Sequence, residues 1–79
     1  MTPAQKLIRS CNGSIEAAQA MLIADIGAFV APFADVNAAT RNLEDHLRRN
    51  DIAPNTLDAV EYLLDLRKLT QAQLAGVTL

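Results

Sequence analysis

The sequence predicts an all-α protein, a compact bundle of about four short helices with antiparallel neighbours and a short C-terminal helical turn. Hydrophobic residues make up 51% of the 79 residues, yet the only aromatic ones are two Phe and one Tyr. Small apolar residues, above all Ala, supply much of the total and suit close helix packing. Apolar residues also recur at three- and four-residue spacing, and no alternating strand pattern of useful length is present. At this length we expect a single helical domain over residues 1–79.

The first helix is predicted from Pro3 to about Cys11. Thr2 can act as its N-cap, and a proline suits the first helical position because its missing N–H is not needed there. Asn12 and Gly13 follow, and both residue types adopt the left-handed conformation that ends many helices. We therefore expect a short helix with a defined start and end.

The second helix is predicted from Ile15 to about Val30, with Ser14 as its N-cap. Its apolar stripe is expected to contain Ile15, Ala18, Leu22, Ile26, Phe29 and Phe33. Pro32 forces a stop or a kink, because the residue before a proline is pushed out of helical geometry.

The third helix is predicted from Val36 to about Asn50, with Asp35 as its N-cap. A narrow apolar stripe is formed by Val36, Ala39, Leu43 and Leu47. The opposite, charged face is expected to lie in solvent and to carry the i,i+4 pairs Glu44–Arg48 and Asp45–Arg49. The link 51–54 ends the helix, and Ile52 is expected to fill the corner of the core.

A fourth helix is predicted to begin at Asn55, with Asp58 in a capping-box-like arrangement three residues later. It carries two apolar stripes, which indicates that other parts of the structure pack against it on two sides. The first stripe consists of Leu57, Val60, Leu63 and Leu64, and the second of Tyr62, Leu66 and Leu69. Residues 70–73 match a Thr-x-x-Gln capping box, which predicts a separate short helix through Leu74 that ends at Gly76.

The run from Ala17 to Ala34 contains one charged residue, Asp25, and one other strongly polar residue, Gln19. An ordinary surface helix keeps a full polar face, so this segment must be covered by its own fold, another subunit or a partner. A membrane span is the less favoured interpretation, because the run includes Asp25 near its middle and Pro32 close to its end.

No residue pattern indicates an enzyme, a cofactor or a metal site. The single histidine, His46, and the single cysteine, Cys11, lie far apart in the sequence, which is not a zinc-like ligand set. Cys11 lies near a helix C-terminus, where the helix dipole disfavours a thiolate, so a small packing residue is expected. His46 is expected to be a partly exposed helix-surface residue.

The charge balance excludes an obvious nucleic-acid binder, since the net charge is −2 and neither half of the chain has a basic excess. A small DNA-binding regulator with a degenerate helix-turn-helix is the alternative function. Residues 13–18 open a helix as many small repressors do, and Arg48 and Arg49 are adjacent bases. However, residues 26–33 (IGAFVAPF) offer no side chain able to read bases where a recognition helix should follow.

The sequence favours a small cytoplasmic interaction protein that docks an apolar helical surface onto itself, as a homodimer or other homo-oligomer, or onto a larger protein. An adaptor, an inhibitor and an antitoxin-like or phage-type regulator fit equally well. A single cysteine suits a reducing compartment, and the opening residues lack a signal-peptide pattern. The expected partner-binding residues are Ile23, Asp25, Ile26, Phe29, Val30 and Phe33.

Asp25 has two interpretations. It can face the edge where the helix meets solvent, or pair with Lys6 or Arg9 across the first helix hairpin. Alternatively, it can be a polar group inside an interface that fixes register or the choice of partner.

Overall fold

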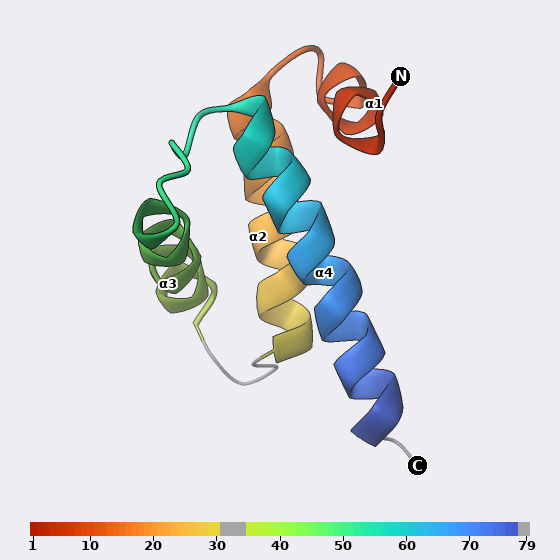
Figure 1. Ribbon diagram of the computed structural model, residues 1–79, viewed down its shortest axis with the longest axis vertical. Helices are drawn as coiled ribbons and strands as arrows, with labels where there is room; N and C mark the ends of the chain where they lie inside the picture. The colour runs from red at the N-terminus through yellow and green to blue at the C-terminus, as the bar shows by residue number, and fades with distance from the viewer. Residues whose placement is uncertain (31–34, 78–79) are drawn as a thin grey trace.

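The computed structural model describes residues 1–30 and 35–77. This part of the chain contains four helices and no strand, which confirms the all-α prediction (Figure 1). The helices are α1 (Pro3–Ser10), α2 (Ile15–Val30), α3 (Val36–Arg49) and α4 (Leu57–Val77). The molecule measures 37 × 25 × 21 Å along its principal axes, and its long axis follows α2 and α4 (Figure 1).

The central helix is α2, which packs against each of the other three helices. In Figure 1, α4 lies in front of α2 and runs in the same direction, whereas α3 lies to the left and runs the opposite way. The direction of the helices reverses between α2 and α3 and again between α3 and α4. Helix α3 is therefore antiparallel to α2 and to α4, as expected of neighbours, while α2 and α4, two steps apart, are parallel. Helix α1 instead lies across the upper ends of α2 and α4 (Figure 1), so the expected antiparallel arrangement does not hold for α1 and α2. Helix α1 packs against α2 and α4 at their N-terminal ends.

The core lies where α2 meets its neighbours. Its buried hydrophobic residues are Ala4, Ala18, Leu22, Ile23, Ile26, Leu47, Ala59, Val60 and Leu63. Fully burying a Leu, Ile or Val side chain contributes about 1.5–3 kcal/mol, so the few large members supply most of the stabilisation. The buried alanines contribute less area, but they let the helix backbones approach closely.

Helix α1 begins and ends as the sequence predicts. The Thr2 hydroxyl oxygen accepts a hydrogen bond from the Gln5 backbone N–H (3.2 Å), and the Gln5 side-chain oxygen accepts one from the Thr2 N–H (3.0 Å). At the other end, Asn12 and Gly13 have φ values of 59° and 80°, and the Gly13 N–H donates to the Ile8 carbonyl (2.9 Å). This reciprocal cap and this left-handed end satisfy backbone groups that a short helix would otherwise leave unpaired.

The predicted caps of α2 and α3 are also present. The Ser14 hydroxyl oxygen accepts from the Ala17 N–H (3.1 Å), and an Asp35 carboxylate oxygen accepts from the Asn37 N–H (3.1 Å). After α3, Asp51 has a φ of 57°, and the chain turns so that the Ile52 N–H donates to the Leu47 carbonyl (3.0 Å). Ile52 is half-buried and packs against the core, as expected at this corner.

The predicted N-cap of α4 is wrong by one residue. Thr56, not Asn55, occupies the capping position: its hydroxyl oxygen accepts from the Ala59 N–H (3.3 Å) and its hydroxyl donates to the Ala53 carbonyl (2.8 Å). One threonine hydroxyl thus ties the helix start to the preceding link. This second bond depends on the path of the link, which the sequence motif does not contain.

The separate terminal helix predicted after Thr70 is also wrong, because α4 continues without a break to Val77. The Thr70 hydroxyl donates to the carbonyl of Leu66 (2.9 Å), one helical turn earlier. A threonine inside a helix commonly makes this bond to the preceding turn, whereas a capping threonine accepts from the following one. The Thr-x-x-Gln pattern alone does not distinguish the two cases.

Candidate functional site

The candidate functional site lies on the exposed side of α2, which differs from the binding surface predicted from the sequence. Ile23 and Ile26 are 6% and 3% exposed, because they pack into the core of the chain. As the single chain folds, neither side chain is available at the surface. The stripe that the sequence marks most strongly is therefore the stripe that the chain itself covers.

Phe29, 37% exposed, remains at the surface near the end of α2. Two other predicted partner-binding positions, the side chain of Val30 and the whole of Phe33, lie outside the part of the chain that the structure describes.

The opposite side of α2 is exposed and apolar. Among the side chains of α2 that the structure describes, every exposed one except Glu16 in the first turn is apolar. Five of them follow one another along a single arc of about 100°, since each residue advances about 100° around a helix. We call this arc the outer face of α2; it consists of Ala17, Ala20, Met21, Ala24 and Ala28. Met21 is its one large side chain, 51% exposed.

Sequence reasoning missed the outer face because alanine is an ambiguous signal. A large apolar residue at helical spacing indicates a buried face, but an alanine is common on buried and exposed faces alike. The signal was the lack of charge: no Lys, Arg, Asp or Glu occurs from Ala17 to Ala24.

One border of the outer face carries an ion pair between α2 and α4. The Arg67 Nη2 lies 3.3 Å from an Asp25 carboxylate oxygen, and both side chains are partly exposed. Asp25 does lie at an edge of the helix packing, but the predicted pairing with Lys6 or Arg9 is wrong. Helix α4 packs alongside α2, which brings Arg67 within reach of Asp25 although the two residues are far apart in the sequence. A partly exposed pair of this kind stabilises a fold by about 0.2–1 kcal/mol.

Along the same border, the residue that follows α1 contacts the outer face. The Cys11 Sγ lies 3.7 Å from the Sδ of Met21. Cys11 is a free, half-buried cysteine that packs against the core, which agrees with the packing role expected for it.

The other border of the outer face meets α3 at a small cavity. This cavity has a volume of about 350 Å³ and is lined in part by Glu16, Gln19, Ala20 and Glu44. Gln19 is only 7% exposed, and its side-chain Nε2 is buried without a hydrogen-bond partner. A buried, unpaired amide N–H is destabilising, since it loses its bonds to water and gains none.

A second open cavity, of about 400 Å³, lies between α3 and α4 on the other side of the molecule. Ile26, Leu43 and Leu66 supply its apolar lining. At one end His46 contacts Tyr62, with ring centroids 5.8 Å apart, and links the two helices. His46 is half-buried, which agrees with the expected position at the surface of its helix.

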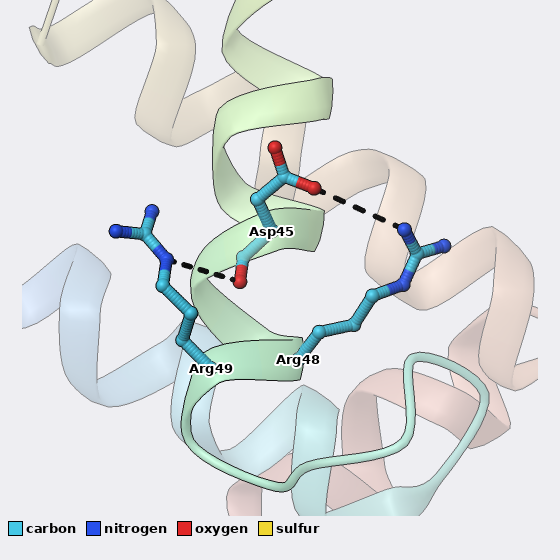
Figure 2. A network of polar contacts seen from close by, with 3 residues as sticks. All are labelled: Asp45, Arg48 and Arg49. Carbon is cyan, nitrogen blue, oxygen red and sulfur yellow. Dashed lines mark hydrogen bonds and ion pairs between the residues drawn. The ribbon is translucent and has the colours of Figure 1, made fainter.

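The charged face of α3 is exposed, but its two predicted side-chain pairs are wrong (Figure 2). Arg48 pairs with Asp45 at 3.9 Å rather than with Glu44. The Arg49 Nε donates to the backbone carbonyl of Asp45 (3.4 Å) rather than to its carboxylate. Long exposed side chains have several partners of similar energy within reach, so spacing alone does not select one.

Within residues 1–30 and 35–77, no group of three or more His, Cys, Asp or Glu side chains is placed to hold a metal ion. No helix of this part is long and apolar enough to cross a membrane. Compared with known families, curated proteins and solved structures, the chain has no match.

Proposed function

We propose that this chain is a small, non-enzymatic protein–protein interaction module that docks through the outer face of α2. Its action would be that of an adaptor or inhibitor, which works by covering a surface of its partner. We place this action in the cytoplasm, where a free thiol such as that of Cys11 persists. The observation that carries the proposal is the apolar, uncharged arc of exposed side chains along the central helix.

The composition of the outer face suits docking. The fully buried centre of a protein interface is depleted of charged residues, as this face is. Alanine side chains let a second helix approach to the short end of the usual 8–10 Å interaxial range. Met21 adds an unbranched, adaptable side chain of the type that is common at binding surfaces.

The borders of the face suit docking as well. A typical interface has a polar rim around its apolar centre. Asp25 and Arg67 supply charged groups on one side, and Glu16 supplies one on the other. Phe29 adds an exposed aromatic ring at the end of α2, and aromatic residues are frequent binding anchors.

The proposal is tested by placing a photo-crosslinking amino acid at Met21 and irradiating cells that produce the chain. We expect a covalent adduct of defined mass from position 21. The matched control is Leu69 on α4, which is also large, apolar and exposed, but lies away from the outer face. Adducts of equal yield from both positions, or none from Met21, would contradict docking through this face.

A further inference from the structure

We propose that the cavity between α2 and α3 binds an arginine side chain of a protein partner, together with an apolar side chain next to it in the partner's sequence. The inference rests on the proposed function, because the cavity lies at a border of the outer face of α2, and it adds the chemistry of the segment that docks there. It is carried by two carboxylates and a buried amide that line the same cavity and have no partner among the described residues.

The cavity has an acidic end and an apolar end. Its α2 side extends from Glu16 to Ile23, and its α3 side from Val36 to Glu44. Because α2 and α3 run in opposite directions (Figure 1), Glu16 lies at the same end as Glu44, and Ile23 lies at the same end as Val36. The two ends are about 10–12 Å apart along the helices, since each residue advances 1.5 Å. A ligand that fills the cavity therefore has a polar part and an apolar part.

The acidic end lacks a counter-charge. The described residues that line the cavity include no Lys or Arg. In residues 1–30 and 35–77, the ion pairs join Arg48 to Asp45 and Arg67 to Asp25, so neither glutamate of the cavity is paired. Glu44 is half-buried, and the attraction between a carboxylate and a cation strengthens as water is displaced around them. This end of the cavity therefore favours a cationic group.

The guanidinium group of arginine suits this end better than the ammonium group of lysine. It is planar, stays charged and carries five N–H donors, so it offers hydrogen bonds to both Glu16 and Glu44. An ammonium ion is more strongly hydrated and loses more when it leaves water. The aliphatic part of an arginine side chain can lie against Ala20, which lines the cavity between its two ends.

Gln19 is an independent sign of a ligand. Its side chain lines the cavity and is 7% exposed, and its Nε2 has no acceptor among the described residues. The terminal amide can turn about its last side-chain bond, so a ligand oxygen in the cavity can supply the missing acceptor. A guanidinium group has no acceptor, whereas every residue of a peptide has a backbone carbonyl. The amide therefore indicates a peptide segment rather than a free organic cation.

The apolar end accepts an apolar side chain of the same segment. Ile23 is 6% exposed and Val36 is 53% exposed, so a side chain placed here covers apolar surface that is now open to water. The Thr40 hydroxyl, which also lines the cavity, already donates to the Val36 carbonyl (2.8 Å) and needs no further acceptor. The segment that fits the whole cavity is thus an arginine beside an apolar residue.

The first test is a titration of the chain with the peptide acetyl-Leu-Arg-Leu-amide, followed by heteronuclear NMR. The matched probe is acetyl-Leu-citrulline-Leu-amide, in which an uncharged urea group of nearly the same shape replaces the guanidinium. We expect the arginine peptide to bind at least about tenfold more tightly, because only its head group is charged. The backbone amide signals around the cavity should shift, and the Gln19 Nε2 protons should move downfield as they gain a hydrogen bond.

The second test uses variants of the cavity. Glu44→Gln is expected to weaken binding of the arginine peptide at least about fivefold. Glu61→Gln removes the same charge from an exposed position of α4 outside this cavity, and should leave the affinity within about twofold. Gln19→Met keeps the helix intact and should weaken binding about fivefold, the value of one net hydrogen bond. Circular dichroism verifies that the variants remain folded.

The outcomes separate this inference from the proposed function. Equal affinity for the two peptides, or signal shifts that do not gather around the cavity, overturns the inference. Binding that neither Glu44→Gln nor Gln19→Met weakens overturns it as well. If Met21 crosslinks to a partner but the arginine peptide does not bind, the inference fails while the proposed function stands. If the peptide binds in the cavity but Met21 crosslinks to nothing, docking through the outer face fails and the cavity alone is supported as a site for basic peptides.

Discussion

Replacing Gln19 with methionine is expected to stabilise the protein. Gln19 lies on α2 and is almost fully buried, and its Nε2 has no hydrogen-bond partner. Methionine has a similar length, is unbranched and has nearly the same helix propensity as glutamine. The substitution therefore removes the unpaired polar group while it changes the packing little.

The magnitude follows from the unpaired amide. A buried donor without a partner destabilises a fold by about 1–3 kcal/mol. Some of this gain is offset, because the thioether will not fill the amide volume perfectly, so we expect a net increase of about 1–2 kcal/mol in the free energy of unfolding. For a domain of this size, each kcal/mol raises the Tm by about 4–8 °C.

The assay is urea unfolding followed by far-UV circular dichroism, with Gln71→Met as the matched control. Gln71 is exposed on α4, so the same substitution there should change stability by no more than about 0.5 kcal/mol. Gln19→Glu should act in the opposite direction at neutral pH, because it buries a carboxylate without a counter-charge. The reasoning is refuted if Gln19→Met is neutral or destabilising while the control behaves as expected.

Three further substitutions test the fold. Leu22→Ala, at a fully buried position of α2, should lower the free energy of unfolding by about 2–5 kcal/mol in urea titration; a smaller loss would show that the core repacks easily. Thr56→Ala should cost about 1 kcal/mol because it removes the α4 cap, whereas Asn55→Ala should change little; the reverse order would restore Asn55 as the cap. Gly27→Ala should raise the free energy of unfolding by less than the ~1 kcal/mol typical of helix positions, since the new Cβ would lie 3.2 Å from that of Ala39. If thermal unfolding shows the full increase in stability, α2 and α3 are not closely packed there.

The beginnings of the first three helices could be predicted because their capping motifs are local. Thr2, Ser14 and Asp35 each bond to a backbone N–H two or three residues later, so the cap residue and its partner are adjacent in sequence. The prediction failed at Thr56 and Thr70, whose hydroxyls donate to the carbonyls of Ala53 and Leu66. Which bond a threonine makes depends on the path of the neighbouring chain.

The candidate site could be predicted only in part. The unusual apolarity of residues 17–34 indicated a helix that needs more cover than its own fold supplies. Large apolar residues such as Ile23 and Ile26 were the natural candidates for an interface. The structure instead uses them in the core and leaves a face of alanines exposed, because the side of α2 with the largest side chains gains most from burial.

The sequence by itself determined the helical class and the extents of the first three helices, because apolar periodicity and capping are properties of neighbouring residues. It also determined that α2 would have too few polar residues to form a full solvent-exposed face. The tertiary structure decided which face of α2 is covered, that Asp25 pairs with Arg67 rather than with a base of α1, and that Gln19 is buried without a partner. The ion pair depends on α4 running parallel to α2, and the burial of Gln19 depends on how α3 packs against α2; both arrangements are set by packing among residues far apart in the chain.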